Sequence, residues 1–233
     1  MTAGLVRVPA AWGEGGGAMC GAAAMDIGVP DVATVSMSSL AEQTAAVAAA
    51  LPDVPVVLGG CCCAHVGAAA GLAARHGRIA VVWFDAHGDL NTPDTSPSGN
   101  LWGMPYRMVL DGGHAAPGDC ALLGARSLDP GENEYIADTG LATSADALER
   151  VLDGTVGTYI AFDCDVLEPS QIDCFMPEPG GPSLDECVGL VAAVVRLAPV
   201  LGIGLTGLVA SPANPLRLRR ILEAALPGAA TAR

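Results

Sequence analysis

The amino-acid sequence predicts an α/β fold, a three-layer α/β/α sandwich with a central, mostly parallel sheet. First, short apolar runs alternate along the chain with segments of helical composition, the order of units that builds a parallel sheet covered on both faces. Second, polar clusters directly follow several predicted strands, and sites in such folds lie beyond the carboxyl ends of strands. Third, 233 residues suit one α/β domain with a full core. Because no repeat or linker interrupts the sequence, we expect residues 1–233 to form a single domain.

The expected strands are short runs of mainly β-branched and aromatic residues bounded by Gly, Pro or Asp. The run that ends at Trp83 and Phe84 is entirely apolar, which indicates a strand buried on both faces. In chain order, the predicted strands span residues 5–8, 54–58, 79–84, 121–124, 158–162 and 201–209.

The expected helices begin at recognisable capping residues. Ser39 and Glu42 have the spacing of a capping box, and Ser144 is expected to cap a later helix. In chain order, the predicted helices span residues 39–51, 63–75, 102–110, 144–152, 184–197 and 215–226. A glycine-rich loop before residue 25 and a proline- and glycine-rich loop over 168–182 are expected to lack regular structure.

Composition excludes several classes of partner. The formal net charge is −14, and every basic residue other than histidine is an arginine. Nucleic acids and anionic membrane surfaces both require basic patches, so neither is an expected partner. The apolar stretch 188–209 is interrupted by Arg196 and Pro199, which favours a helix followed by a buried strand over a membrane span. Eight cysteines, three of them consecutive, without a secretory signal suggest a cytoplasmic protein with reduced thiols.

The segment from Trp83 to Pro105 carries the main candidate site. Asp85, His87 and Asp89 alternate directly after a predicted strand, so we expect their side chains to share one face. The alternative is a solvated polar loop with an isolated histidine. Carboxylates and an imidazole at one point are the ligands that divalent cations require.

A second pair, Asp163 and Asp165, alternates in the same way after the strand at 158–162. Four carboxylates and one imidazole are more than one cation needs, and without metal they would repel one another and raise one another's pKa. Two divalent cations would remove this repulsion and would lower the pKa of a water to roughly 7.

Three motifs resemble those of the arginase/agmatinase (ureohydrolase) family. They are DAHGDLN, TSPSGN followed by GMP, and FDCD followed by Glu168 and Pro169, and they lie in the family's order between Leu5 and Pro212. The resemblance implies a three-layer α/β/α fold and hydrolysis of guanidino or amidine C–N bonds. It also implies a binuclear manganese centre, a small-molecule substrate and a homo-oligomer, often a trimer or hexamer.

The resemblance implies a role for each metal-site residue. Asp85 and Asp163 would bridge two metals, and His87 and Asp165 would complete one metal site. Asp89 would serve the other metal and hold the nucleophilic water, which makes it the candidate catalytic residue.

The resemblance also implies a substrate subsite. Asn91 and Ser98 match positions that bind a substrate α-carboxylate, and Asp129 and Glu132 match positions that recognise its α-amino group. The alternative for Asp129 and Glu132 is a turn that enters a helix, which the intervening Pro and Gly would produce in any case.

Three departures from the family motifs concern the chemistry. Cys62 stands where a metal-binding His is expected, Trp102 replaces a His thought to shuttle protons or polarise the substrate, and Val209 replaces the Glu that holds the guanidinium. In addition, the family's GTG loop is replaced here by residues 174–179. Loss of a charge-assisted partner costs several kcal/mol, so we do not expect efficient hydrolysis of arginine.

Cys62 has three open interpretations. A thiolate ligand would favour zinc or iron over manganese. The three cysteines could instead form a buried turn of small residues, because Cys is among the most buried residue types. A covalent nucleophile would need a base that is not already committed to a metal, which makes this the weakest option. His65, three residues later, is expected at the surface or at a helix cap, and the alternative is a side chain that reaches inward from the start of the helix.

These observations predict a metal-dependent hydrolase of the ureohydrolase type, with one or two metals, acting on a modified amino acid. The main alternative is a catalytically silent homologue that acts as a binding or partner subunit. A chance cluster of aspartates is a third interpretation, which the ordered motifs disfavour.

Overall fold

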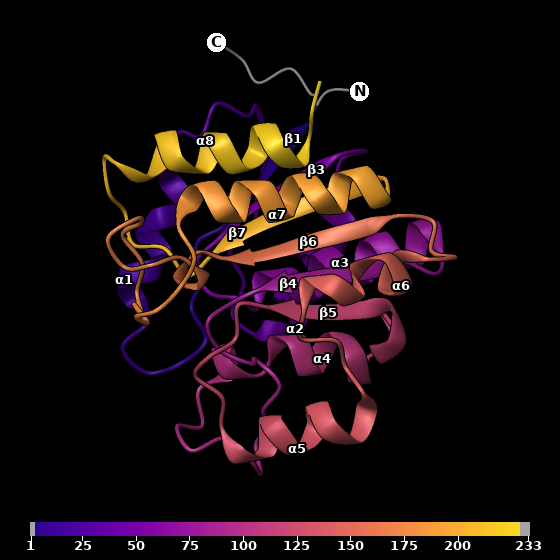
Figure 1. Cartoon of the computed structure of the whole chain (residues 1–233). Coiled ribbons are helices and arrows are strands. Elements are labelled where there is room, and N and C mark those ends of the chain that lie inside the picture. The colour runs from indigo at the N-terminus through magenta and orange to yellow at the C-terminus, as the bar shows by residue number, and fades with distance from the viewer. Residues whose placement is uncertain (1–2, 229–233) are drawn as a thin grey trace.

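A seven-stranded parallel sheet forms the centre of the computed structural model, which describes residues 3–228 (Figure 1). The strand order is β2-β1-β3-β7-β6-β4-β5, and every pairing of these strands is parallel. This confirms the predicted α/β class. The strands are β1 (Gly4–Val8), β2 (Asp31–Thr34), β3 (Pro55–Gly59), β4 (Ala80–Phe84), β5 (Cys120–Leu123), β6 (Thr158–Asp163) and β7 (Val200–Thr206).

Helices cover both faces of the sheet. α7 and α8 pack together on one face, whereas α2, α3 and α4 lie on the other (Figure 1). Neighbouring residues of β4 point to opposite cores, with Val82 and Phe84 in one and Val81 and Trp83 in the other. The helices are α1 (Gly17–Cys20), α2 (Leu40–Ala50), α3 (Ala64–His76), α4 (Pro105–Asp111), α5 (Pro130–Thr139), α6 (Leu148–Leu152), α7 (Leu184–Leu197) and α8 (Asn214–Ala225).

Most predicted elements are present, with differences at their ends. β7 ends at Thr206, so residues 207–209 belong to the following loop and not to the predicted strand. The predicted helix 102–110 is divided into a 3₁₀ turn and α4, and the predicted helix 144–152 into a 3₁₀ turn and α6. Among the strands and α-helices of the described residues, three were not predicted: β2, the short α1 and the polar α5.

Within residues 3–228, no helix combines the length and the apolar character that crossing a bilayer requires.

Candidate metal and substrate site

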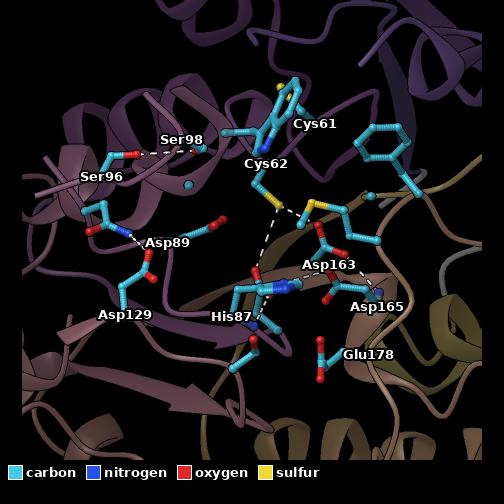
Figure 2. A pocket seen from close by; sticks show the side chains of 18 of the residues that line it. Cys61, Cys62, His87, Asp89, Ser96, Ser98, Asp129, Asp163, Asp165 and Glu178 are labelled. Carbon is cyan, nitrogen blue, oxygen red and sulfur yellow. Dashed lines mark hydrogen bonds and ion pairs between the residues drawn. The ribbon is translucent and has the colours of Figure 1, made fainter. Parts of the chain in front are cut away.

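The candidate site lies at the carboxyl ends of four neighbouring strands. β3, β7, β6 and β4 lie side by side in the sheet, and loops after them contribute to the lining of a cavity of about 350 Å³. Figure 2 shows side chains from several of these loops pointing toward one another. Strand order therefore brings together segments that are far apart in the sequence, at the edge where α/β folds place ligands.

The loop after β4 brings Asp85, His87 and Asp89 together, but not through the alternation of an extended strand. β4 ends at Phe84, and Asp85 Oδ1 accepts a hydrogen bond of 2.7 Å from the backbone N–H of His87, which closes a tight turn. Asp89 has a φ of 54°, in the left-handed region. The expectation of an extended segment is therefore wrong, and a turn directs the three side chains instead.

The loop after β6 is built in a similar way. The backbone N–H of Asp165 donates to Asp163 Oδ1 at 2.9 Å, and Cys164–Val166 forms a 3₁₀ turn, so strand alternation is again the wrong explanation. Asp165 Oδ1 accepts a hydrogen bond from the Ala86 N–H at 3.0 Å, and its Oδ2 lies 3.0 Å from His87 Nδ1. These contacts join the loop after β4 to the loop after β6, the two loops that carry the aspartates and the histidine of the candidate metal site.

Cys62 lies just before α3 and reaches the same cluster. Its Sγ donates to Asp163 Oδ2 at 2.6 Å and lies 3.2 Å from Thr206 Oγ1 and 4.0 Å from Asp85 Oδ2 (Figure 2). Burial and the charges of Asp163 and Asp89 raise the pKa of this thiol well above its usual value. Cys62 is therefore a neutral thiol in the metal-free protein and would need a cation to form a thiolate.

The buried carboxylates carry strongly shifted pKa values. Burial, together with the neighbouring carboxylates, raises the pKa of Asp163 to about 7 and that of Asp165 to about 6, and it also raises those of Asp85 and Asp89. Burial alone would lower the pKa of His87, but hydrogen bonds to Asp165 and Asp85 raise it to about 12. A proton on His87 thus offsets part of the charge that a metal would offset.

The donor groups fit two divalent cations. Cys62, Asp85 and Asp89 bring ligand atoms within 4.8 Å of one another, and Asp85, His87 and Asp165 form a second such group. Asp85 belongs to both groups. Asp89 Oδ2 is buried and, among the described residues, has no hydrogen-bond partner, which is costly unless a cation or water satisfies it. The residues therefore fit a binuclear centre, in which Asp163 borders the first group through its contact with Cys62.

The predicted substrate residues also line the cavity, but part of their hydrogen-bonding capacity is used internally. Asn91 Nδ2 donates to Asp129 Oδ2 at 2.8 Å, and Asn91 Oδ1 accepts a hydrogen bond from Thr95 Oγ1 at 2.9 Å. Ser98 is exposed, and its Oγ accepts a hydrogen bond of 3.2 Å from the Asn100 N–H. Asn91 and Asp129 thus form a fixed pair, whereas Ser98 is exposed to solvent.

Glu132 supports the loop that carries the metal-type residues. Its Oε1 accepts a hydrogen bond from the Leu90 N–H at 3.0 Å, and its Oε2 accepts one from the Asp129 N–H at 2.9 Å. Asp129 and Pro130 form the start of α5, as the alternative of a turn entering a helix describes. Because backbone amides engage both oxygens of Glu132, its carboxylate ties Leu90, in the loop after β4, to Asp129 at the start of α5.

His65 is completely buried, so the expectation of a surface or capping histidine is wrong. Its Nδ1 lies 2.9 Å from the Tyr159 hydroxyl, and its Nε2 lies 2.9 Å from Thr206 Oγ1, which in turn contacts Cys62. Gly204 leaves the room for this ring, because a Cβ there would overlap it. The sequence did not predict that His65 or Thr206 belongs to the site. The available signal was Thr206, a polar residue at the end of the apolar run of β7.

An apolar wall and one arginine complete the surroundings of the site. The rings of Trp102 and Phe175 meet edge to face with centroids 5.8 Å apart, and both line the cavity. Arg126 donates hydrogen bonds to backbone carbonyls of two segments, to that of Asp165 at 3.0 Å and to that of Glu178 at 2.6 Å. Trp102 and the loop 174–179 were recognisable in the sequence as departures from the family motifs. No role was predicted for Arg126 or Glu178.

Comparison with known proteins points to one family. The Arginase family model matches residues 16–207 of this chain. An arginase from Bacillus caldovelox is 36% identical over 168 residues, which are 58% of this chain and 56% of that protein. The chain thus spans about half the length of the curated relatives it matches.

Solved structures share the fold over nearly the whole chain. An arginase from Bacillus subtilis superimposes with a TM-score of 0.85 at 23% identity, covering 97% of this chain and 99% of that chain. A formimidoylglutamase from Bacillus subtilis gives a TM-score of 0.77 at 22% identity, covering 98% and 87%. These similarities confirm the predicted three-layer architecture.

Proposed function

Because this chain belongs to the arginase family, we propose that it is a metal-dependent hydrolase of a C–N bond in a guanidino, amidino or related amino-acid-like substrate. The observation that supports this most strongly is the pair of ligand groups that share Asp85. One group contains carboxylates and an imidazole, and the other contains carboxylates and a thiol. This donor set suits two divalent cations and has no other evident purpose in a buried cavity.

The proposed metal ligands are the residues at the strand ends. Manganese is the expectation from the family, and zinc or iron becomes favoured at the first group if Cys62 ligates, because thiolates prefer softer cations. When bound, divalent cations supply a water that is acidic enough to act as a nucleophile at neutral pH. The proposed ligands are Asp85, His87, Asp89, Asp163, Asp165 and Cys62.

The residues of the chain would hold and orient the reactants. Asp89 is the proposed catalytic residue, because its side chain lines the cavity (Figure 2) and its Oδ2 has no hydrogen-bond partner among the described residues. Its carboxylate would accept a hydrogen bond from the attacking water. Asp129 and Asn91, fixed to each other, are proposed to contact the substrate, as is Ser98. Glu132 is retained as a proposed substrate-site residue that acts by holding the other groups in place.

Arginine itself is not the expected substrate. Val209, at the position of the family's guanidinium-binding Glu, is half-buried and carries no charge, and Trp102 brings bulk without a basic nitrogen. The same departures support the alternative function, a catalytically silent homologue that acts as a binding or partner subunit. A homo-oligomer, a trimer or hexamer by family resemblance, and a cytoplasmic location also remain proposals.

Release of ammonia or urea from a panel of guanidino and amidino compounds tests the proposed activity. We expect turnover of at least one panel member by metal-loaded protein, very weak turnover of arginine, and a loss of at least a hundredfold with Asp89→Asn. Asp138→Asn, an exposed change on α5, is the matched control and should retain full activity. Metal-loaded protein that turns over none of the panel would contradict the hydrolase and favour the silent homologue.

A further inference from the structure

One wall of the cavity is apolar and held rigidly from behind. Trp102 and Phe175 line it together with Met19 and Met176. The Trp102 ring lies against the glycine-rich loop at Gly13, where any Cβ would overlap it. Trp102 also packs on the cluster of Cys61 and Cys63, which flank Cys62 in the sequence. The apolar wall therefore borders the floor of the cavity, which is formed by the proposed metal ligands. A flat apolar group placed on this floor would contact the aromatic edges.

The charge of the cavity favours a cation. Its described lining includes seven carboxylates and one histidine but no lysine or arginine. Two divalent cations would offset the charge of the four aspartates proposed as metal ligands. Asp129 and Glu132 already accept hydrogen bonds from other residues of the chain. The Glu178 side chain, in contrast, makes no hydrogen bond or ion pair with any residue of the described chain, while Arg126 fixes its backbone carbonyl. Figure 2 shows the Glu178 carboxylate at the same cavity.

We propose that this cavity takes a small organic cation with an apolar body and no carboxylate. Within the substrates proposed above, this selects guanidino and amidino compounds that lack the carboxylate of an amino acid. The amidinium or guanidinium group would lie between Glu178 and the proposed metal ligands on the floor of the cavity. The apolar body, a ring or a branched alkyl group, would pack on Trp102 and Phe175. A volume of about 350 Å³ lies at the lower end of small-molecule sites, which suits a ligand of this size. An anionic substituent would meet Glu178 and no basic residue of the described lining.

This inference rests on the proposed function, because the C–N bond to be cleaved would belong to the cationic group. Benzamidine is the probe, benzoate is the control for charge, and guanidinium is the control for the apolar body. Calorimetry with metal-loaded protein should give benzamidine a dissociation constant at least tenfold below that of either control. Trp102→Ala, Phe175→Ala and Glu178→Gln should each weaken benzamidine binding about tenfold.

Glu223→Gln, an exposed change on α8, removes a charge outside the cavity and should leave binding unchanged. Equal affinity for benzamidine and benzoate, or binding that is insensitive to both the Glu178 and the wall substitutions, would overturn the inference. If Trp102→Ala does not fold, Phe175→Ala tests the same wall. Metal-loaded protein that hydrolyses a linear amidine but fails these binding tests contradicts the ligand class alone. Selective benzamidine binding without any amidine turnover contradicts the hydrolase alone.

Discussion

Four aspartates share a buried volume with a single histidine, and the metal-free protein must accommodate their charge. It does so with raised carboxyl pKa values and a protonated His87 between Asp85 and Asp165. A bound cation performs the same task without protons. Protons and metal therefore compete for one set of side chains, which makes metal binding dependent on pH.

The metal-free protein should lose stability as pH rises. Asp163 and Asp165 have pKa values of about 7 and 6 in the folded state, above the ordinary aspartate value of 3.8, so the folded state binds more protons between about pH 4 and 7. The raised pKa of His87, about 12, acts in the same direction above pH 6.5. Chelator-treated protein should therefore have a lower thermal midpoint at pH 8 than at pH 5, and adding divalent metal should remove the difference. A metal-free midpoint that rises over this range would contradict the account.

The buried His65 should contribute to stability through its two hydroxyl partners. His65→Phe keeps a ring of similar size but leaves the hydroxyl of Tyr159 without its partner and removes one from Thr206. We expect a loss of about 2 kcal/mol in the free energy of unfolding, measured by urea denaturation. His76→Phe makes the same chemical change at an exposed position of the same helix and should cost less than about 0.5 kcal/mol. Equal losses in the two variants would argue against this role for the hydrogen bonds.

Individual side chains were predictable where motifs placed them, but their local geometry was not. The motifs around Asp85 and Asp163 identified the cluster, whereas hydrogen bonds from backbone amides to the aspartates themselves decide how the chain turns there. The burial of His65 depends on Tyr159, which is far away in the sequence. Such contacts arise only when strands pair, so no local pattern reports them.

Among the elements, the loops after β5 and β6 are joined by one side chain. Arg126 donates to the carbonyls of Gly124, Asp165, Val166, Glu178 and Pro179, and so connects the metal-type turn to the loop that carries Glu178. Hydrogen bonds to a charged donor contribute more than neutral ones.

Arg126→Gln should therefore weaken both stability and metal binding. We expect a loss of about 2–3 kcal/mol in the free energy of unfolding and weaker binding of divalent metal in a competition titration. Arg150→Gln, on the exposed side of α6, supplies the same change without these contacts. A variant at Arg126 that unfolds and binds metal like the control would show that the guanidinium is dispensable.

The central elements were predictable from sequence, but the peripheral ones were not. β4 and β6 are continuous apolar runs and stood out clearly. β2 is short and mostly exposed at the sheet edge, and α5 is largely polar, so neither has the apolar periodicity that identifies an element. Their existence depends on tertiary pairing, not on local preference.

For the molecule as a whole, the order of the strands creates the site. Four neighbouring strands end at the site: Cys62 follows β3, Thr206 ends β7, Asp163 and Asp165 lie at the end of β6, and the turn that begins at Asp85 follows β4. The residues at the end of any one of these strands are an incomplete set of metal ligands. Structures of an arginase and a formimidoylglutamase share the fold over nearly the whole chain. We therefore propose that the folded chain holds two divalent cations.

Metal content of the purified protein tests that claim directly. After growth with manganese, zinc and iron, native mass spectrometry should find two divalent ions per chain. Asp163→Asn should lose at least one of them, and the exposed Asp138→Asn should keep both. A wild-type chain that carries no metal under these conditions would contradict the account.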